Sequence, residues 1–97
     1  MIIKRFYKTN HFWKRAWERG IHQAEIDKLL EKTSLRPEKG KRLLVFSKNT
    51  LKYAGIVRKG KSYLVIVAKY NVLITIFEVP DLFYYLRKIK DAKIILL

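Results

Sequence analysis

The spacing of hydrophobic residues along the chain changes near residue 42. Before this position apolar residues recur every three or four places, which is typical of helices. After it they form denser runs rich in Val, Ile, Leu, Tyr and Phe, which are typical of strands. We therefore expect an α+β domain in which two N-terminal helices pack across one face of a twisted antiparallel sheet of four or more strands, with a short C-terminal helix.

The N-terminal part predicts a helical hairpin. The first helix follows Thr9 or Asn10, whose side-chain oxygen can cap it, and ends at Gly20, which tolerates the left-handed conformation after a helix. The second starts near His22 and ends near Lys32, and Glu25 stands where a capping box would place it. Its buried stripe is Ile26, Leu29 and Leu30. A basic loop without apolar periodicity follows over 33–41.

The second half of the chain predicts strands joined by tight turns. We expect a loose edge strand over 2–7 and sheet strands over 42–47, 51–57, 62–69 and 72–79. The turns Lys48-Asn49, Lys59-Gly60-Lys61 and Tyr70-Asn71 are short enough to force antiparallel hairpins. The last two strands are nearly continuous in apolar residues, so both of their faces should be covered and they should lie centrally in the sheet.

The C-terminal segment predicts one more helix and a docked tail. Asp81 can cap a helix that runs through Leu82, Phe83, Leu86 and Ile89. The apolar tail over 94–97 should dock as a strand or contact a partner. We treat residues 1–97 as a single domain, because this length suffices to bury one core.

The net charge of the chain is its most unusual bulk property. It has 22 Lys and Arg against 8 Asp and Glu, a formal charge of +14. Such a field concentrates polyanions, so nucleic acid is the default partner. The N-terminus becomes charged too early for a signal peptide, and no apolar run approaches the length of a membrane span. We therefore expect a cytoplasmic protein without a membrane partner.

Several classes of site have little support in the sequence. There is no cysteine, which excludes disulfides, zinc-thiolate sites and thiol nucleophiles. The two histidines are eleven residues apart and the carboxylates are scattered, so neither a metal site nor a cofactor is expected. Gly55 and Gly60 are isolated, and no phosphate-binding loop is visible.

The first helix carries the strongest candidate chemistry. At about 100° per residue, His11, Arg15 and Arg19 fall on one side, and the opposite side is expected to be core. An imidazole in line with two guanidiniums can hold a phosphodiester and move a proton on it. The alternative is a solvated basic face with an incidental histidine. The residues expected in the core are Phe12, Trp13, Ala16 and Trp17.

The pattern H-x3-R-x3-R-G-I over 11–21, followed by a second helix and a four-strand meander, resembles small toxin-like domains of the barnase, EndoU, colicin and RelE superfamily of RNases. In that superfamily the final strand often has a Ser or Thr two residues before an aromatic, and Thr75-Ile76-Phe77 fits this step. The likeness spans about residues 9–79, and the strand motif is less specific than the helix motif.

The resemblance implies metal-independent RNA cleavage, in which the 2′-hydroxyl attacks phosphorus and leaves a 2′,3′-cyclic phosphate. His11 would be the general base or acid, Arg15 and Arg19 would bind the phosphate, and Thr75 would position it. The natural partner would be an acidic inhibitor or antitoxin covering the basic surface.

Further residues are candidates for RNA contact or for simple solvation. Stacking of bases on Trp13 or Trp17 is possible in principle, although we expect both rings in the core. His22 is expected to be a weak helix cap. A noncatalytic RNA-binding or DNA-binding module is the alternative to a ribonuclease. The further RNA-binding candidates are Lys14, Tyr53, Arg58, Lys59, Lys61 and Tyr70.

Overall fold

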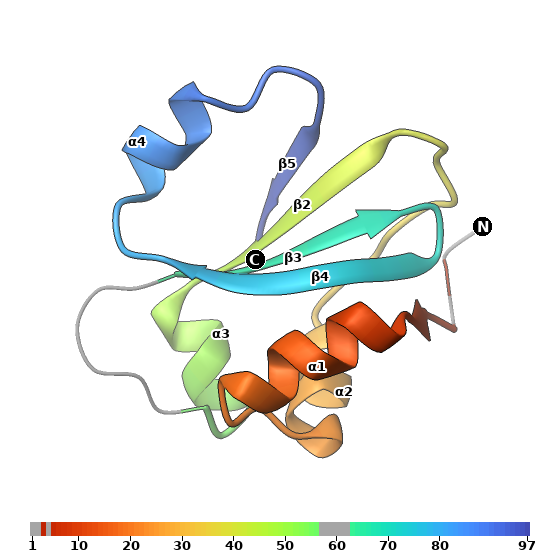
Figure 1. The fold of residues 1–97 in the computed structure, drawn as a ribbon, viewed down its shortest axis with the longest axis vertical. Helices are drawn as coiled ribbons and strands as arrows, with labels where there is room; N and C mark the ends of the chain where they lie inside the picture. Colours follow the sequence, from red (N-terminus) through yellow and green to blue (C-terminus); the bar gives the residue numbers. More distant parts are fainter. Residues whose placement is uncertain (1–2, 4, 57–62) are drawn as a thin grey trace.

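The computed structural model describes residues 3, 5–56 and 63–97. It is an α+β fold with a five-stranded sheet in the order β1-β4-β3-β2-β5 (Figure 1). The strands are β1 (Tyr7–Lys8), β2 (Lys41–Phe46), β3 (Tyr63–Lys69), β4 (Val72–Val79) and β5 (Lys93–Leu96). The helices are α1 (Asn10–Glu18), α2 (Gln23–Glu31), α3 (Lys48–Tyr53) and α4 (Leu82–Arg87).

The sheet is mixed, so the expectation of a purely antiparallel sheet is wrong at its two edges. The three central strands pair antiparallel, and Tyr70 and Asn71 form the predicted turn between β3 and β4. At one edge β1 runs parallel to β4, and at the other β5 runs parallel to β2. The edge strands differ because each joins the sheet beside a strand that is not its neighbour in sequence. The apolar tail forms β5, one of the two expected outcomes.

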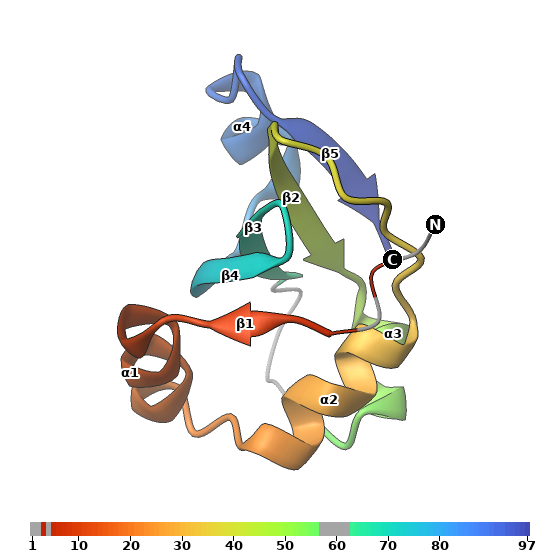
Figure 2. The ribbon, with the colours of Figure 1, turned by 90° about the vertical axis from the view of Figure 1, so that its right-hand side faces the viewer.

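The sheet has helices on both faces (Figure 2). α1, α2 and α3 cover one face, which holds the larger core cluster, and α4 lies on the other. Alternate residues of the central strand β3 serve the two clusters, Ile66 on the α1 side and Val65 on the α4 side. This arrangement confirms the prediction that β3, with its nearly continuous apolar run, lies centrally and is covered on both faces.

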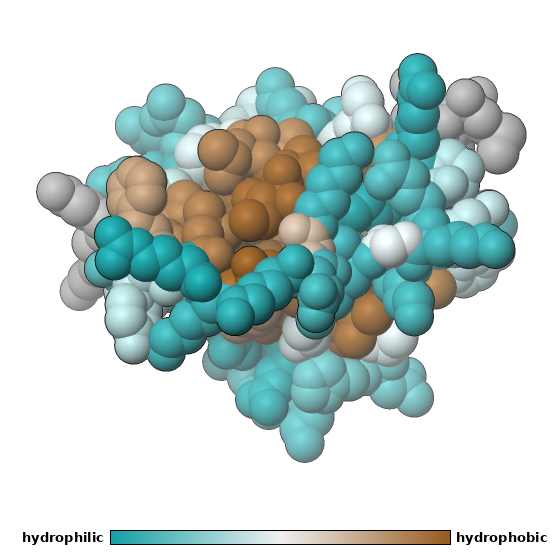
Figure 3. Space-filling model, turned by 90° about the horizontal axis from the view of Figure 1, so that it is seen from above, coloured by the Kyte–Doolittle hydropathy of each residue, from teal (hydrophilic) through white to brown (hydrophobic). Residues whose placement is uncertain are grey.

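The α4 face is covered less completely than the α1 face. No residue of α4 is fully buried, and Phe83 and Tyr84 are exposed. A view from above Figure 1 shows an apolar area bordered by hydrophilic residues (Figure 3). Asp81 caps α4 as predicted, since its carboxylate accepts a hydrogen bond from the Tyr84 backbone N–H at 3.0 Å.

The segment predicted as a strand over 51–57 instead begins with the second half of the helix α3. Lys48 and Asn49 begin this helix and do not form a hairpin turn. Gly55 has a φ of +81°, and the Ile56 N–H donates to the Leu51 carbonyl at 2.9 Å, which closes the helix with a Schellman motif. Of the edge strand predicted over 2–7, the described residues form strand only at Tyr7, where β1 begins. The predicted turn over 59–61 lies outside the described residues.

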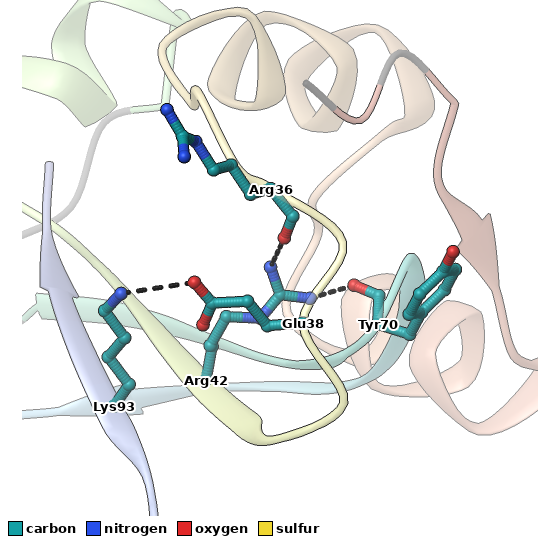
Figure 4. Close-up of polar contacts among 5 residues, drawn as sticks. All are labelled: Arg36, Glu38, Arg42, Tyr70 and Lys93. Carbon is teal, nitrogen blue, oxygen red and sulfur yellow. Dashed lines mark hydrogen bonds and ion pairs between the residues drawn. The ribbon is translucent and has the colours of Figure 1, made fainter. Parts of the chain in front are cut away.

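A buried arginine on β2 fixes the loop between α2 and β2 (Figure 4). The Arg42 guanidinium donates from Nη1 to the Arg36 carbonyl at 2.8 Å and from Nη2 to the Tyr70 carbonyl. Its Nε has no hydrogen-bond partner among the described residues. Burial lowers the pKa of Arg42, and the nearby Glu38 carboxylate opposes this shift. The loop predicted to be an irregular basic segment is therefore attached to the β3–β4 turn.

Candidate nucleic-acid interface

The start of α1 is attached to the sheet through one hydroxyl group. The Thr9 Oγ1 accepts a hydrogen bond from the Phe12 N–H at 3.0 Å and donates to the Ile74 carbonyl of β4 at 3.0 Å. Phe12 and Ala16 are then buried against the sheet. The predicted cap and the predicted inward residues are confirmed at these positions, and α1 is a rigid support for the side chains on its other sides.

The end of α1 is a Schellman motif. Gly20 has a φ of +66°, its N–H donates to the Trp17 carbonyl, and the Ile21 N–H donates to the Ala16 carbonyl, both at 2.9 Å. Ile21 is buried in the core. The next residue, His22, caps α2 as predicted, and its backbone N–H donates to Glu25 Oε1 at 2.9 Å. The tight turn therefore places His22 beside the last turn of α1.

The three predicted basic-row residues lie on α1 or at its C-terminus, but they are not equivalent. His11 and Arg15 are exposed, whereas Arg19 is half-buried. Arg15 forms an ion pair with Glu18 at 3.2 Å, and Arg19 Nη1 donates to the Arg15 carbonyl at 3.3 Å. His11 has no hydrogen-bond or ion-pair partner among the described residues. No side chain there orients its ring as the partner of a general base usually does.

Trp17 is not a core residue, contrary to the prediction. Its side chain is 76% exposed, and Trp13 is only half-buried. Phe12 and Ala16 define the direction of the core, and Trp17 lies about 100° from Ala16 and about 140° from Phe12 around the helix. Trp13 lies closer to that direction and packs edge-on against Phe12, with ring centroids 5.7 Å apart. Ile21, beyond the helix, supplies a buried side chain at this end.

A hollow of about 450 Å³ lies beside Trp17. The rings of Trp17 and His22 stand nearly perpendicular, with centroids 6.3 Å apart, and form one corner of it. Its lining consists of Trp13, Lys14, Trp17, Ile21, His22 and Gln23. Lys14 has no ion-pair partner among the residues that the structure describes. The site therefore combines aromatic surface with an uncompensated cation.

Thr75 is not brought to the α1 surface. It pairs with Val67 of β3, whose side chain belongs to the apolar cluster on the α4 face. The adjoining pair is Ala68 with Leu73, so Ile74 is an extra residue in β4 and forms a β-bulge. Strict alternation from Leu73, which faces α1, would have put Thr75 on the α1 face. The bulge places it on the opposite face from His11.

The remaining predicted RNA-binding residues do not join this hollow. The Tyr53 hydroxyl donates to Glu31 Oε2 at 3.1 Å, and this hydrogen bond raises the Tyr53 pKa above its ordinary value. Lys32 Nζ lies 4.1 Å from the centroid of the same ring. Tyr70 is exposed in the β3–β4 turn. Arg58, Lys59 and Lys61 lie outside the described residues.

Neither a metal site nor a membrane-spanning helix is found within the described parts of the chain. No group of three or more His, Asp or Glu side chains is placed to hold a metal ion among residues 3, 5–56 and 63–97. Within the same ranges, no helix has the length and apolar character required to cross a membrane.

Comparison with protein-family models, with curated proteins and with solved structures found no match for this chain. The likeness to the RNase superfamily therefore stays a prediction from the residues of α1 and β4.

Proposed function

We propose that this protein binds RNA through the exposed side of α1. The observation that carries this proposal is the open Trp17 ring beside Lys14, with Arg15 further around the exposed surface of the same helix, in a chain with a formal charge of +14. Cations positioned next to exposed aromatic surface are typical of proteins that bind single-stranded nucleic acids.

The cations of this side are available for phosphate contacts. Lys14 is exposed and has no carboxylate partner within the described ranges. The ion pair of Arg15 with Glu18 is solvent-exposed, and exposed pairs contribute about 1 kcal/mol or less, so a phosphate can replace the carboxylate. Arg19 is half-buried at the end of the helix, where its guanidinium donates to the Arg15 carbonyl.

Binding of a labelled single-stranded RNA, measured by fluorescence anisotropy over a range of salt concentrations, tests this proposal. Lys14→Ala and Arg15→Ala should each weaken binding and reduce the slope of log affinity against log salt by about one. Lys90→Ala, which removes an exposed lysine beyond α4, is the matched control and should change the slope less. Equal slopes in all three variants and the unaltered protein would contradict a site on α1.

RNA cleavage at His11 is a second candidate function. It is supported by the exposure of His11 in the first turn of α1, with Arg15 one turn further along the same side. His11 would take the proton of the 2′-hydroxyl as the O2′–P bond forms and the P–O5′ bond breaks, and the 5′-oxygen would regain a proton. Arg15 would stabilise the charge on the phosphorane. The position of Thr75 on the other face leaves it no part in this step.

The cleavage hypothesis has its own test. His11→Ala should lose at least about 10²-fold in rate while RNA affinity and thermal stability stay nearly unchanged. Cleavage should persist in chelator and yield a 2′,3′-cyclic phosphate end, which mass spectrometry detects. RNA that stays intact when bound to the purified protein would contradict this hypothesis and would leave the binding proposal in place. An acidic inhibitor protein, if one exists, would compete with RNA for the same cations.

A further inference from the structure

We infer that the hollow beside Trp17 binds an unpaired nucleobase of single-stranded RNA. The inference rests on the proposed RNA binding and adds the part of the ligand that the site recognises. Phosphate contacts alone would need only the cations of α1, whereas the hollow offers surface for a base.

The first argument is the exposure of a tryptophan on a helix that is fixed at both ends. A tryptophan with 76% of its surface exposed gains little from burial, yet its helix is fixed to β4 at the start and closed by Gly20 at the end. An aromatic side chain on such a support loses little conformational entropy when a flat ligand stacks on it. Stacking on an aromatic side chain is a recurring way to bind a base without reading its sequence.

The second argument is the composition of the hollow. Trp13 and Ile21 supply apolar surface, and His22 stands nearly perpendicular to Trp17 at one corner. Gln23 supplies an amide that can donate and accept at a base edge, as small-molecule sites combine apolar walls with a few polar groups. The volume of about 450 Å³ lies within the range of such sites.

The third argument is the charge around the hollow. Lys14 belongs to its lining, and Arg15, about 160° from Trp17 around the helix, extends the positive charge beyond the hollow. An apolar ligand would gain nothing from these cations, whereas a base carries its phosphate with it. A duplex keeps its bases stacked and paired, so only an unpaired base can present a free face to Trp17.

The test compares three probes, each over the same range of salt concentrations: a single-stranded RNA, the same strand in a duplex, and an abasic strand of equal length. The single strand should bind most tightly. Trp17→Ala should weaken its binding about 5- to 100-fold, which corresponds to one stacked base, while the salt slope stays unchanged. Trp17→Phe should keep most of the affinity. Tyr53→Ala, which removes an aromatic ring that is 48% exposed elsewhere, should change little.

A spectroscopic measurement complements the affinities. Trp13→Phe leaves Trp17 as the sole tryptophan, and its fluorescence should be quenched by the single strand and much less by the abasic strand. In Trp17→Phe, the remaining Trp13 should respond less. Circular dichroism should show that each variant is folded.

The outcomes distinguish a failure of the base site from a failure of the proposed RNA binding. Binding of RNA with the expected salt slopes, but with equal affinity in Trp17→Ala or for the abasic strand, overturns the base site and leaves phosphate binding intact. Salt slopes that do not respond to Lys14→Ala or Arg15→Ala, together with strong Trp17 quenching, would instead overturn the role of the α1 cations. Absence of any RNA binding overturns both.

Discussion

Helices α1 and α3 end in the same way, although they lie apart in the sequence. Each is followed by a glycine with a positive φ, +66° at Gly20 and +81° at Gly55. An isoleucine comes next in both, and its side chain enters the core. Both isoleucine N–H groups donate at 2.9 Å to a carbonyl in the last turn of their helix. One local device therefore turns the chain back toward the core twice.

The exposed aromatic rings near these two ends differ in their surroundings. Trp17 is next to a hollow and touches one ring, that of His22. Tyr53 donates its hydroxyl to Glu31 and has the ammonium groups of Lys28 and Lys32 over its ring. An exposed aromatic residue is therefore a candidate binding surface only where the neighbouring side chains leave its ring uncovered.

Truncation of the two buried isoleucines that follow these helix ends should have the largest effect on the stability of the protein. Ile21→Ala and Ile56→Ala should each lower the free energy of unfolding by about 2–4 kcal/mol, because each leaves a cavity in the core. Urea unfolding followed by circular dichroism measures the loss. The corresponding Ile→Val variants serve as controls and should lose about 0.5–1.5 kcal/mol. A large loss at one position and none at the other would show that the two helix ends are not equivalent.

Substitution of either glycine should affect stability through the backbone conformation alone. An added Cβ would meet no atom within 4 Å at Gly20 or Gly55, so the cost of Gly→Ala comes from the left-handed conformation, about 1–2 kcal/mol each. Thermal unfolding measures it. Gly→Asn at the same positions should cost less, since Asn visits this conformation more readily. Equal stability of the Ala variants and the unaltered protein would contradict the left-handed conformation of these two residues.

The hydrogen bond from the Tyr53 hydroxyl to Glu31 can be tested by measuring the Tyr53 pKa. Glu31→Gln should lower the Tyr53 pKa toward its ordinary value, because the carboxylate that accepts its hydrogen bond disfavours the tyrosinate. Carbon NMR of labelled tyrosine rings over a pH titration measures the shift. Asp27→Asn, on the same helix but paired with Lys8, should leave the Tyr53 pKa nearly unchanged. A pKa that does not fall in Glu31→Gln would mean that the hydrogen bond does not persist in solution.

The smallest effect is expected for the stability of Trp17 variants. Because the ring is 76% exposed, Trp17→Phe should change the free energy of unfolding by no more than about 0.5 kcal/mol. Denaturant unfolding of this variant, beside Phe12→Ala as a destabilised reference, provides the measurement. A loss comparable to that of the reference would indicate that Trp17 packs in the core, as the sequence pattern had suggested.

Much of the fold could be predicted because local chemistry marks its elements. Thr9, Gly20 and Asp81 stand at helix ends as their side chains or conformational freedom require. The helix α3 was missed because the residues over 51–57 suit a strand as well as a helix. The sequence Ala54-Gly55-Ile56 resembles Arg19-Gly20-Ile21 and could have indicated a helix end.

The candidate site was less predictable, because it depends on packing directions. Trp17 and Trp13 are four residues apart and look alike in a pattern, yet only the position of the core separates them. Thr75 depends on the bulge at Ile74, which exchanges the two faces of β4. No feature of the local sequence predicts this extra residue. The corner formed by Trp17 and His22 arises from two different helices and follows only once the turn between them is known.

The bonds of Arg42 have a consequence for the order in which parts of the protein open. The side chain joins a loop carbonyl at Arg36 to a turn carbonyl at Tyr70, 28 residues further along the chain than Arg42 itself. Because both partners are backbone atoms of irregular segments, neither segment can detach without leaving a buried charge short of a partner. Glu38, in the same loop, also pairs with Lys93 of β5. We therefore expect amide hydrogens of the loop, the turn and the β5 edge to exchange as one cooperative unit.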